Sequence, residues 1–191
     1  MMMGNYSEYA NEPPEVWRNP IIARKWCLML AAGKAAQFRF AVGPRLQNAR
    51  HEAAHLVAGW VLGFKCTGAV LADDPARGGV AAVGTQPHTD RLPTPVDVHR
   101  ERSRIKTNDT WRIARLVYVH GWASGWKAIR AAVRQIRQQA MQLVRENWDA
   151  IRSVAHDLNE RGQLGAVEFR LALYAALAYQ ASWRFTGLFS A

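Results

Sequence analysis

The spacing of apolar residues along the chain predicts a mainly helical protein. Apolar positions recur every three or four residues over long stretches, and this is the period of an amphipathic helix. Ile129, Val133, Ile136, Ala140 and Leu143 are one such series. With glycine, proline and capping residues as boundaries, the pattern predicts helices over about 14–40, 47–62, 107–121, 126–161 and 166–184.

A shorter pattern lies directly after the second predicted helix. Two β-prone runs, Cys66–Leu71 and Val80–Thr85, flank the turn-forming sequence "DDPARGG". They predict a β-hairpin, and "PHTDRLPTPVD" then predicts a loop because it contains three prolines. The predicted fold class is therefore mainly α with a small β element. Gly43-Pro44 ends the first predicted helix, and the chain is expected to divide into residues 1–46 and residues 47–191.

Composition limits the class of protein. The 191 residues suffice for one domain, and 49% apolar with 21% charged residues is an ordinary globular balance. The two cysteines form no CxxC motif, which favours a reducing compartment. Charged residues interrupt the apolar N-terminal stretch, so it is not expected to span a membrane, and the expected location is cytoplasmic.

The net charge of +10 is the strongest deviation from average composition. It allows an acidic protein, a nucleic acid or an anionic membrane surface as partner. Arg130, Arg134 and Arg137 recur at helical spacing beside an apolar face. Since basic residues are spread along the chain, a solvated helix face is favoured over phosphate contacts, and nucleic acid is the less favoured partner.

The candidate chemistry lies in "ARHEAAHLVAGWVLGF", residues 49–64. His51 and His55 are four residues apart, so on a helix they project from one face about 6 Å apart and can share one Zn²⁺. Glu52 is turned by about 100° from His51, where a carboxylate can accept a proton from a metal-activated water.

The histidine motif also has a simpler interpretation, in which a surface helix carries these residues merely as polar side chains. Alanine, leucine and valine around the motif make most sides of the helix apolar, which predicts burial. Burying two histidines and a glutamate without a partner would cost several kcal/mol. A metal ion is the simplest way to satisfy all three.

"RHEAAHLVAGWVLG" resembles the zinc-binding helix of the FtsH family of metalloproteases. The likeness covers about residues 47–175: "GAVLADDPARGGVAAVG" is similar to the β element that follows this helix in the family, "TNDTWRIARLV" to the segment with the third ligand, and the end of the chain to a closing helical hairpin. The resemblance implies a zincin-like metallopeptidase domain at 47–191, ending in a C-terminal helical bundle, preceded by a helical extension at 1–46.

The resemblance implies His51, His55 and Asp109 as zinc ligands and Glu52 as the general base. Asn-Asp before a helix is also a routine cap, so Asp109 has a structural alternative. Other candidates for the third ligand are carboxylates and histidines of the preceding segment: His88, Asp90, Asp97, His99 and Glu101.

Two departures from the family matter. The interval between His55 and Asp109 is shorter than usual, and the ATPase module is not recognisable, because Gly33-Lys34 is followed by Ala35 and not by a hydroxyl residue. The expected function is a zinc-dependent endopeptidase acting on flexible or unfolded polypeptides, with a separate unfoldase as a partner for folded ones. The alternative is a non-catalytic basic module with a structural or vestigial metal site that binds an acidic protein or nucleic acid.

Overall fold

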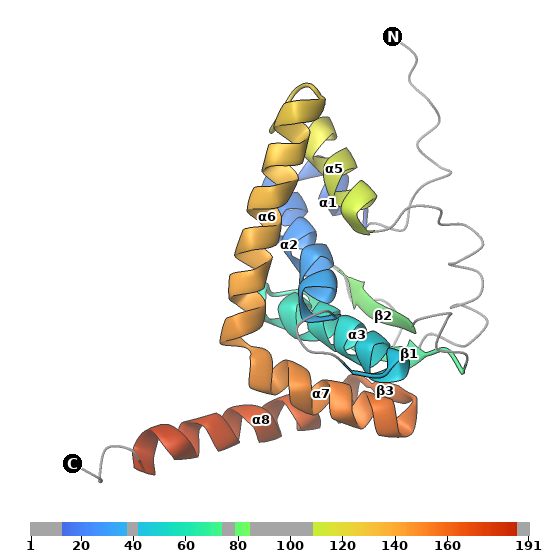
Figure 1. Cartoon of the computed structure of the whole chain (residues 1–191), viewed down its shortest axis with the longest axis vertical. Helices are drawn as coiled ribbons and strands as arrows, with labels where there is room; N and C mark the ends of the chain where they lie inside the picture. The colour runs from blue at the N-terminus through green and yellow to red at the C-terminus, as the bar shows by residue number, and fades with distance from the viewer. Residues whose placement is uncertain (1–12, 38–41, 74–78, 85–108, 187–191) are drawn as a thin grey trace.

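The computed structural model describes residues 13–37, 42–73, 79–84 and 109–186. The elements in these ranges are helices α1 (Pro14–Arg18), α2 (Pro20–Gln37), α3 (Pro44–Val61), α5 (Asp109–Val119), α6 (Trp126–Glu146), α7 (Trp148–Arg161) and α8 (Ala166–Thr186), and strands β1 (Lys65–Leu71), β2 (Gly79–Gly84) and β3 (Gln163–Gly165). The mainly helical fold class is thus confirmed, with a small antiparallel sheet (Figure 1).

Helix α3 lies at the centre of the fold. It packs against α2 on one side and α7 on another, and the sheet covers part of it (Figure 1). Ala49, Ala53, Ala54, Leu56 and Val57 are fully buried, so the predicted burial of this helix is confirmed. Three of these five residues are alanines, whose small side chains allow neighbouring backbones to approach closely.

The sheet has the order β2-β1-β3, with β1 antiparallel to both neighbours. The predicted hairpin is confirmed as β1 and β2, although position 85 of its expected second run lies outside the described residues. Gly59 lets α3 approach this hairpin, because a Cβ atom there would lie 2.8 Å from Cγ1 of Val83 and 3.2 Å from Sγ of Cys66. The sheet is therefore packed directly on the histidine helix.

The first predicted helix is divided in two. Asn19 has an extended backbone, and its side-chain oxygen accepts hydrogen bonds from the N–H groups of Ile21 and Ile22 at 2.9 and 3.3 Å. This is the geometry of an N-cap, and Pro20, which has no N–H, suits the first turn that follows. The chain therefore restarts as α2 after Asn19. The predicted end near Phe40 lies outside the described residues.

The predicted helix over 126–161 is also divided, at Asn147. Its backbone departs from helical angles with φ −112° and ψ 19°, and its side-chain amide donates to the carbonyl of Leu143 at 2.8 Å. The break has a packing reason, since α6 packs along α2 whereas α7 packs against α3. A single straight helix could not bury both apolar faces.

Residues before position 46 contribute to the same core as the histidine helix. Trp26, Met29 and Leu30 of α2 are buried in one hydrophobic cluster with residues of α3, α5 and α6. The division into an extension and a domain stays a prediction. Among the described helices, none combines the length and the apolar character needed to traverse a bilayer.

The end of α7 provides a test of this packing. Gly162 adopts the left-handed conformation with φ +75°, and its carbonyl accepts a hydrogen bond from Leu71 of β1 at 2.7 Å. A side chain in this conformation costs about 1 kcal/mol, less for asparagine. We expect Gly162→Ala to lower the free energy of unfolding by about that amount and Gly162→Asn by less, measured by urea denaturation. Equal stability of Gly162→Ala and wild type would contradict the assigned backbone geometry.

Candidate metal centre

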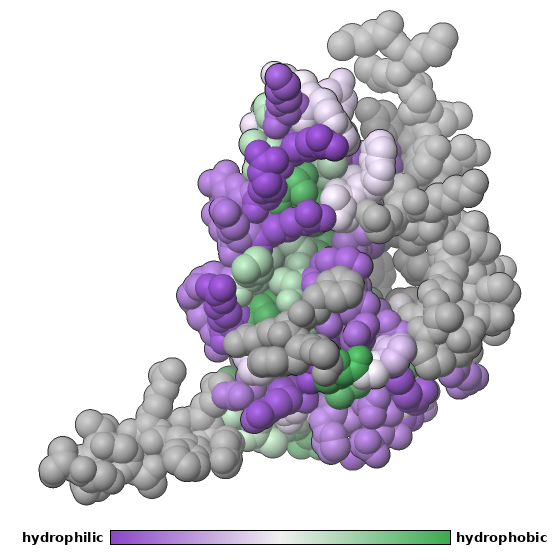
Figure 2. Space-filling view, viewed as in Figure 1, coloured by the Kyte–Doolittle hydropathy of each residue, from purple (hydrophilic) through white to green (hydrophobic). Residues whose placement is uncertain are grey.

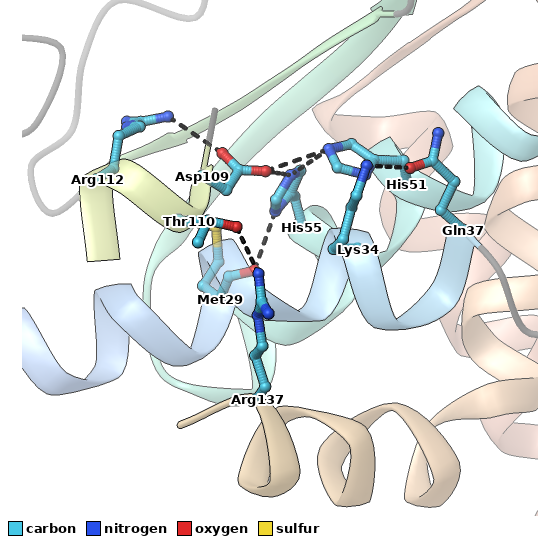
Figure 3. Close-up of polar contacts among 9 residues, drawn as sticks. All are labelled: Met29, Lys34, Gln37, His51, His55, Asp109, Thr110, Arg112 and Arg137. Carbon is cyan, nitrogen blue, oxygen red and sulfur yellow. Dashed lines mark hydrogen bonds and ion pairs between the residues drawn. The ribbon is translucent and has the colours of Figure 1, made fainter. Parts of the chain in front are cut away.

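Helix α3 directs His51 and His55 toward the same point. One helical turn separates them, and their Nε2 atoms lie 3.0 Å apart (Figure 3). The imidazole of His55 is buried, whereas the side chain of His51 is 19% exposed. The histidine pair therefore has one side inside the protein and one side near its surface.

Asp109 joins the two histidines from the first residue of α5. Its Oδ2 atom lies 3.4 Å from Nε2 of His51 and 3.7 Å from Nε2 of His55. Among the described residues, these three side chains form a group whose donor atoms all lie within 4.8 Å of one another. The structure thus brings together the three residues expected as ligands. We call them the His-His-Asp cluster.

The cluster has the dimensions of a tetrahedral site. Ligand atoms bound to Zn²⁺ at 2.0–2.1 Å in tetrahedral geometry are about 3.3 Å apart. The three observed separations are 3.0, 3.4 and 3.7 Å, which bracket that value. Two imidazole nitrogens and one carboxylate oxygen are also a donor set found at catalytic zinc, where the fourth position stays open for water or substrate. The residues present therefore fit this ion.

Electrostatics keep two of the three donors in the form that a metal requires. Burial and the charge of His51 lower the pKa of His55 to about 4, so this imidazole is neutral at pH 7. Burial alone would raise the pKa of Asp109, but the hydrogen bond from His51 and the neighbouring positive charges lower it to about 2. For His51, burial lowers the pKa, but Asp109 and Glu52 outweigh it and the net shift is upward. A metal would therefore compete with a proton at His51.

Helix α2 orients the ring of His55. The Nδ1 atom of His55 lies 3.0 Å from the carbonyl oxygen of Met29, and since a carbonyl only accepts, Nδ1 is the donor. This bond fixes the tautomer so that the Nε2 lone pair points into the cluster, as metal sites commonly require. In contrast, Nδ1 of His51 is buried and has no hydrogen-bond partner among the described residues. Met29 cannot be identified from the sequence, because its contact is made by a backbone carbonyl, which every residue type carries.

Gly33 of α2 provides the space for both imidazoles. A Cβ atom at this position would lie 2.5 Å from Nε2 of His55 and 2.9 Å from Cε1 of His51. Such distances are shorter than real contacts, so any larger residue would displace a ring. Gly33-Lys34 does not form a phosphate-binding loop. Gly33 instead lies against the donor atoms of the cluster and leaves room for both imidazole rings.

Arg112 holds the other carboxylate oxygen of Asp109. Its guanidinium nitrogen lies 3.6 Å from Oδ1, one helical turn along α5 (Figure 3). With Oδ1 next to Arg112, Oδ2 is the oxygen directed at the histidines. Arg112 therefore positions the carboxylate, a role that sequence analysis did not assign.

Glu52 is buried next to the cluster. Only 5% of this residue is exposed, and Gly79 of β2 lies over it, since a Cβ atom there would come 2.9 Å from Cγ of Glu52. Glu52 directly follows His51 in the chain, and its charge raises the pKa of His51. Glu52 is thus enclosed between α3 and β2, beside the histidines and outside the set of three donors.

The other candidates for the third ligand belong to a segment before α5. His88, Asp90, Asp97, His99 and Glu101 lie outside the described residues. Elsewhere in the structure, His120 contacts the carbonyl of Val16 through Nε2 at 2.8 Å, and His156 is exposed on α7. Neither of these two histidines belongs to the cluster.

Zinc binding can be tested with a matched pair of variants. We expect one zinc per chain in the wild type, and at least tenfold weaker binding in Asp109→Asn, because the amide lacks the charge that compensates the ion. Asp149→Asn removes an aspartate that is 47% exposed at the start of α7 and should bind zinc like the wild type. Titration against a competing chelator measures both. Equal affinity of the two variants would exclude Asp109 as a ligand.

The close approach of α2 gives a second test. Gly33→Ala should weaken zinc binding at least tenfold, because the new methyl group collides with the ring that carries a donor atom. The control is Gly43→Ala, since a Cβ atom at Gly43 meets nothing within 4 Å. Zinc affinity should be measured by calorimetry, with circular dichroism to verify helix content. A Gly33→Ala protein that binds zinc as tightly as the control would contradict the described packing.

Comparison of the chain with protein-family models, with curated proteins and with solved structures finds no match in any of the three. The likeness to the FtsH family therefore stays a prediction from the residues quoted above. The function has to be inferred from the chemistry of the His-His-Asp cluster and its surroundings.

Proposed function

We propose that this protein is a zinc-dependent endopeptidase that hydrolyses peptide bonds in flexible or unfolded polypeptides. The observation that carries the proposal is the convergence of His51, His55 and Asp109, with donor separations suited to a tetrahedral ion, next to the buried carboxylate of Glu52. Two histidines, a carboxylate and a separate glutamate are the set that a metal-assisted hydrolase needs.

In the proposed mechanism each residue has a distinct task. His51, His55 and Asp109 would hold the ion, which when bound would supply the Lewis acidity needed to activate water and polarise the peptide carbonyl. Glu52 accepts the proton of the attacking water and then delivers it to the departing amine. Met29 and Arg112 keep the donors oriented, so that little reorganisation accompanies the reaction.

The sheet supports an extended substrate. β2 is an edge strand, and among the described residues its only strand partner is β1. An extended polypeptide can add to such an edge through backbone hydrogen bonds, and this requires a substrate segment without its own structure. Since Gly79 of β2 lies over Glu52, a segment added along β2 would pass close to the proposed general base. Folded substrates would need a separate unfoldase.

The proposal is tested by the cleavage of an unstructured protein such as casein. We expect cleavage by the wild type, its loss on chelation, and its return on addition of zinc. Glu52→Gln should lower the rate by about 10²-fold or more, because the amide cannot accept a proton. Glu160→Gln, a change at an exposed position near the end of α7, is the control.

The zinc content of each variant should be measured in parallel. Unchanged zinc in an inactive Glu52→Gln protein separates proton transfer from metal binding. Casein cleavage that survives both chelation and Glu52→Gln would refute the proposal. A protein that binds zinc yet cleaves nothing would favour the alternative, a non-catalytic interaction module with a structural or vestigial metal site.

A further inference from the structure

Helix α6 carries its positive charges along one side. Five basic residues recur at helical spacing and all are exposed; we call them the basic stripe: Lys127, Arg130, Arg134, Arg137 and Arg145. Successive intervals of three, four, three and eight residues keep them within one narrow arc of the helix. At 1.5 Å per residue the stripe is about 27 Å long.

The other sides of α6 carry no basic residues. The buried residues Ile129, Val133, Ile136, Ala140 and Val144 line one side of the stripe. Glutamines occupy much of the other side, and Glu146 is the single acidic residue of the helix. Figure 2 shows strongly hydrophilic side chains along the exposed side of α6.

This arrangement differs from that of a helix face built only for solvation. Like charges three and four residues apart repel one another, and opposite charges at the same spacing would stabilise the helix instead. Lys127, Arg130, Arg134 and Arg137 stand at such spacings with no acidic residue among them, so their repulsion lowers the stability of the helix. A bound anionic segment would turn the same charges into attractive contacts.

The middle of the basic stripe is attached to the candidate metal centre. A guanidinium nitrogen of Arg137 donates to the hydroxyl of Thr110 at 2.6 Å, and Thr110 directly follows Asp109 (Figure 3). The side chains of His51 and Asp109 are 19% and 21% exposed, so the cluster is accessible from outside. The stripe therefore lies next to the start of α5, the helix that carries Asp109.

An exposed aromatic side chain lies beside the charges. Trp126, 57% exposed, begins α6, and the guanidinium of Arg130 lies 5.1 Å from its ring centre. A tryptophan can contact apolar residues of a bound polypeptide segment, and a neighbouring arginine can contact its acidic residues. The stripe, about 27 Å long, has room for about eight residues of an extended chain.

We propose that the basic stripe of α6 is a docking site for acidic segments of polypeptide substrates. This inference rests on the proposed function, since a centre that cleaves peptide bonds makes polypeptide the appropriate occupant. The stripe would hold an acidic segment while a neighbouring part of the same substrate reaches the metal centre. The proposed substrates of the enzyme are therefore unfolded polypeptides that contain acidic segments.

The test uses peptides that differ only in a charged tail. A segment cleaved in casein is synthesised with a tail of glutamates, of lysines or of serines. Wild-type kcat/KM should be about tenfold higher with the glutamate tail than with the serine tail, and the difference should fall as salt is added. In the double variant Arg130→Gln/Arg134→Gln the preference should fall below about twofold, through KM and with kcat unchanged. Arg137 is left intact because it contacts Thr110.

The matched control removes the same charge elsewhere. Arg161 and Arg170 are exposed on α7 and α8, and Arg161→Gln/Arg170→Gln should keep the preference for glutamate. Equal loss of the preference in both double variants would overturn the docking site, because overall charge would then explain the effect. A wild-type protein with no preference for the glutamate tail would overturn it as well.

Direct binding separates this inference from the proposed function. Fluorescence anisotropy of the labelled glutamate-tailed peptide is measured with Glu52→Gln protein, which is not expected to cleave it. Salt-sensitive binding that is lost only in the α6 double variant supports the docking site even if no peptide is ever cleaved. Tighter binding of a single-stranded oligonucleotide of similar length would overturn it in favour of a nucleic-acid surface.

Discussion

The contact between α2 and the histidine face of α3 is the constraint on which the candidate centre depends. Gly33 brings the α2 backbone so close that an added Cβ atom would collide with the donor nitrogen of His55. At this short range the carbonyl of Met29 can fix the ring, and burial between the two helices lowers the pKa of His55. If α2 were moved outward by the width of a methyl group, the orientation, the neutrality and the burial of this imidazole would all change together.

The same contact explains the composition of both helices. Alanine is frequent in α2 and α3, and Ala32, Ala36, Ala53 and Ala54 are all fully buried. Small side chains let helix axes approach more closely than leucine or phenylalanine would. Larger apolar residues such as Leu56 and Phe169 are buried in the same hydrophobic cluster. The small residues of α2 and α3 thus allow the close approach of the two helices around the donors.

Sequence could predict those parts of the structure that depend on local spacing. The periods of the helices, the hairpin, and the shared face of His51 and His55 all follow from intervals within one element. Asp109 was accessible only through a family resemblance, because its approach to α3 depends on how distant elements pack. Gly33, Met29 and Arg112 were missed for the same reason. The helix breaks at Asn19 and Asn147 were missed because the apolar period continues across them, although Asn19-Pro20 is a readable signal.

The ion pair between Arg112 and Asp109 has a consequence for the choice of cation. A carboxylate whose second oxygen is engaged by a guanidinium offers one oxygen to an ion, so the cluster provides one oxygen and two nitrogens. Calcium takes six to eight oxygen ligands and magnesium requires octahedral oxygen coordination, so both are poorly served here. Small ions that accept nitrogen and low coordination numbers are favoured instead. The ion pair of Arg112 with Asp109 thus favours an ion such as Zn²⁺ over Ca²⁺ and Mg²⁺ at the proposed site.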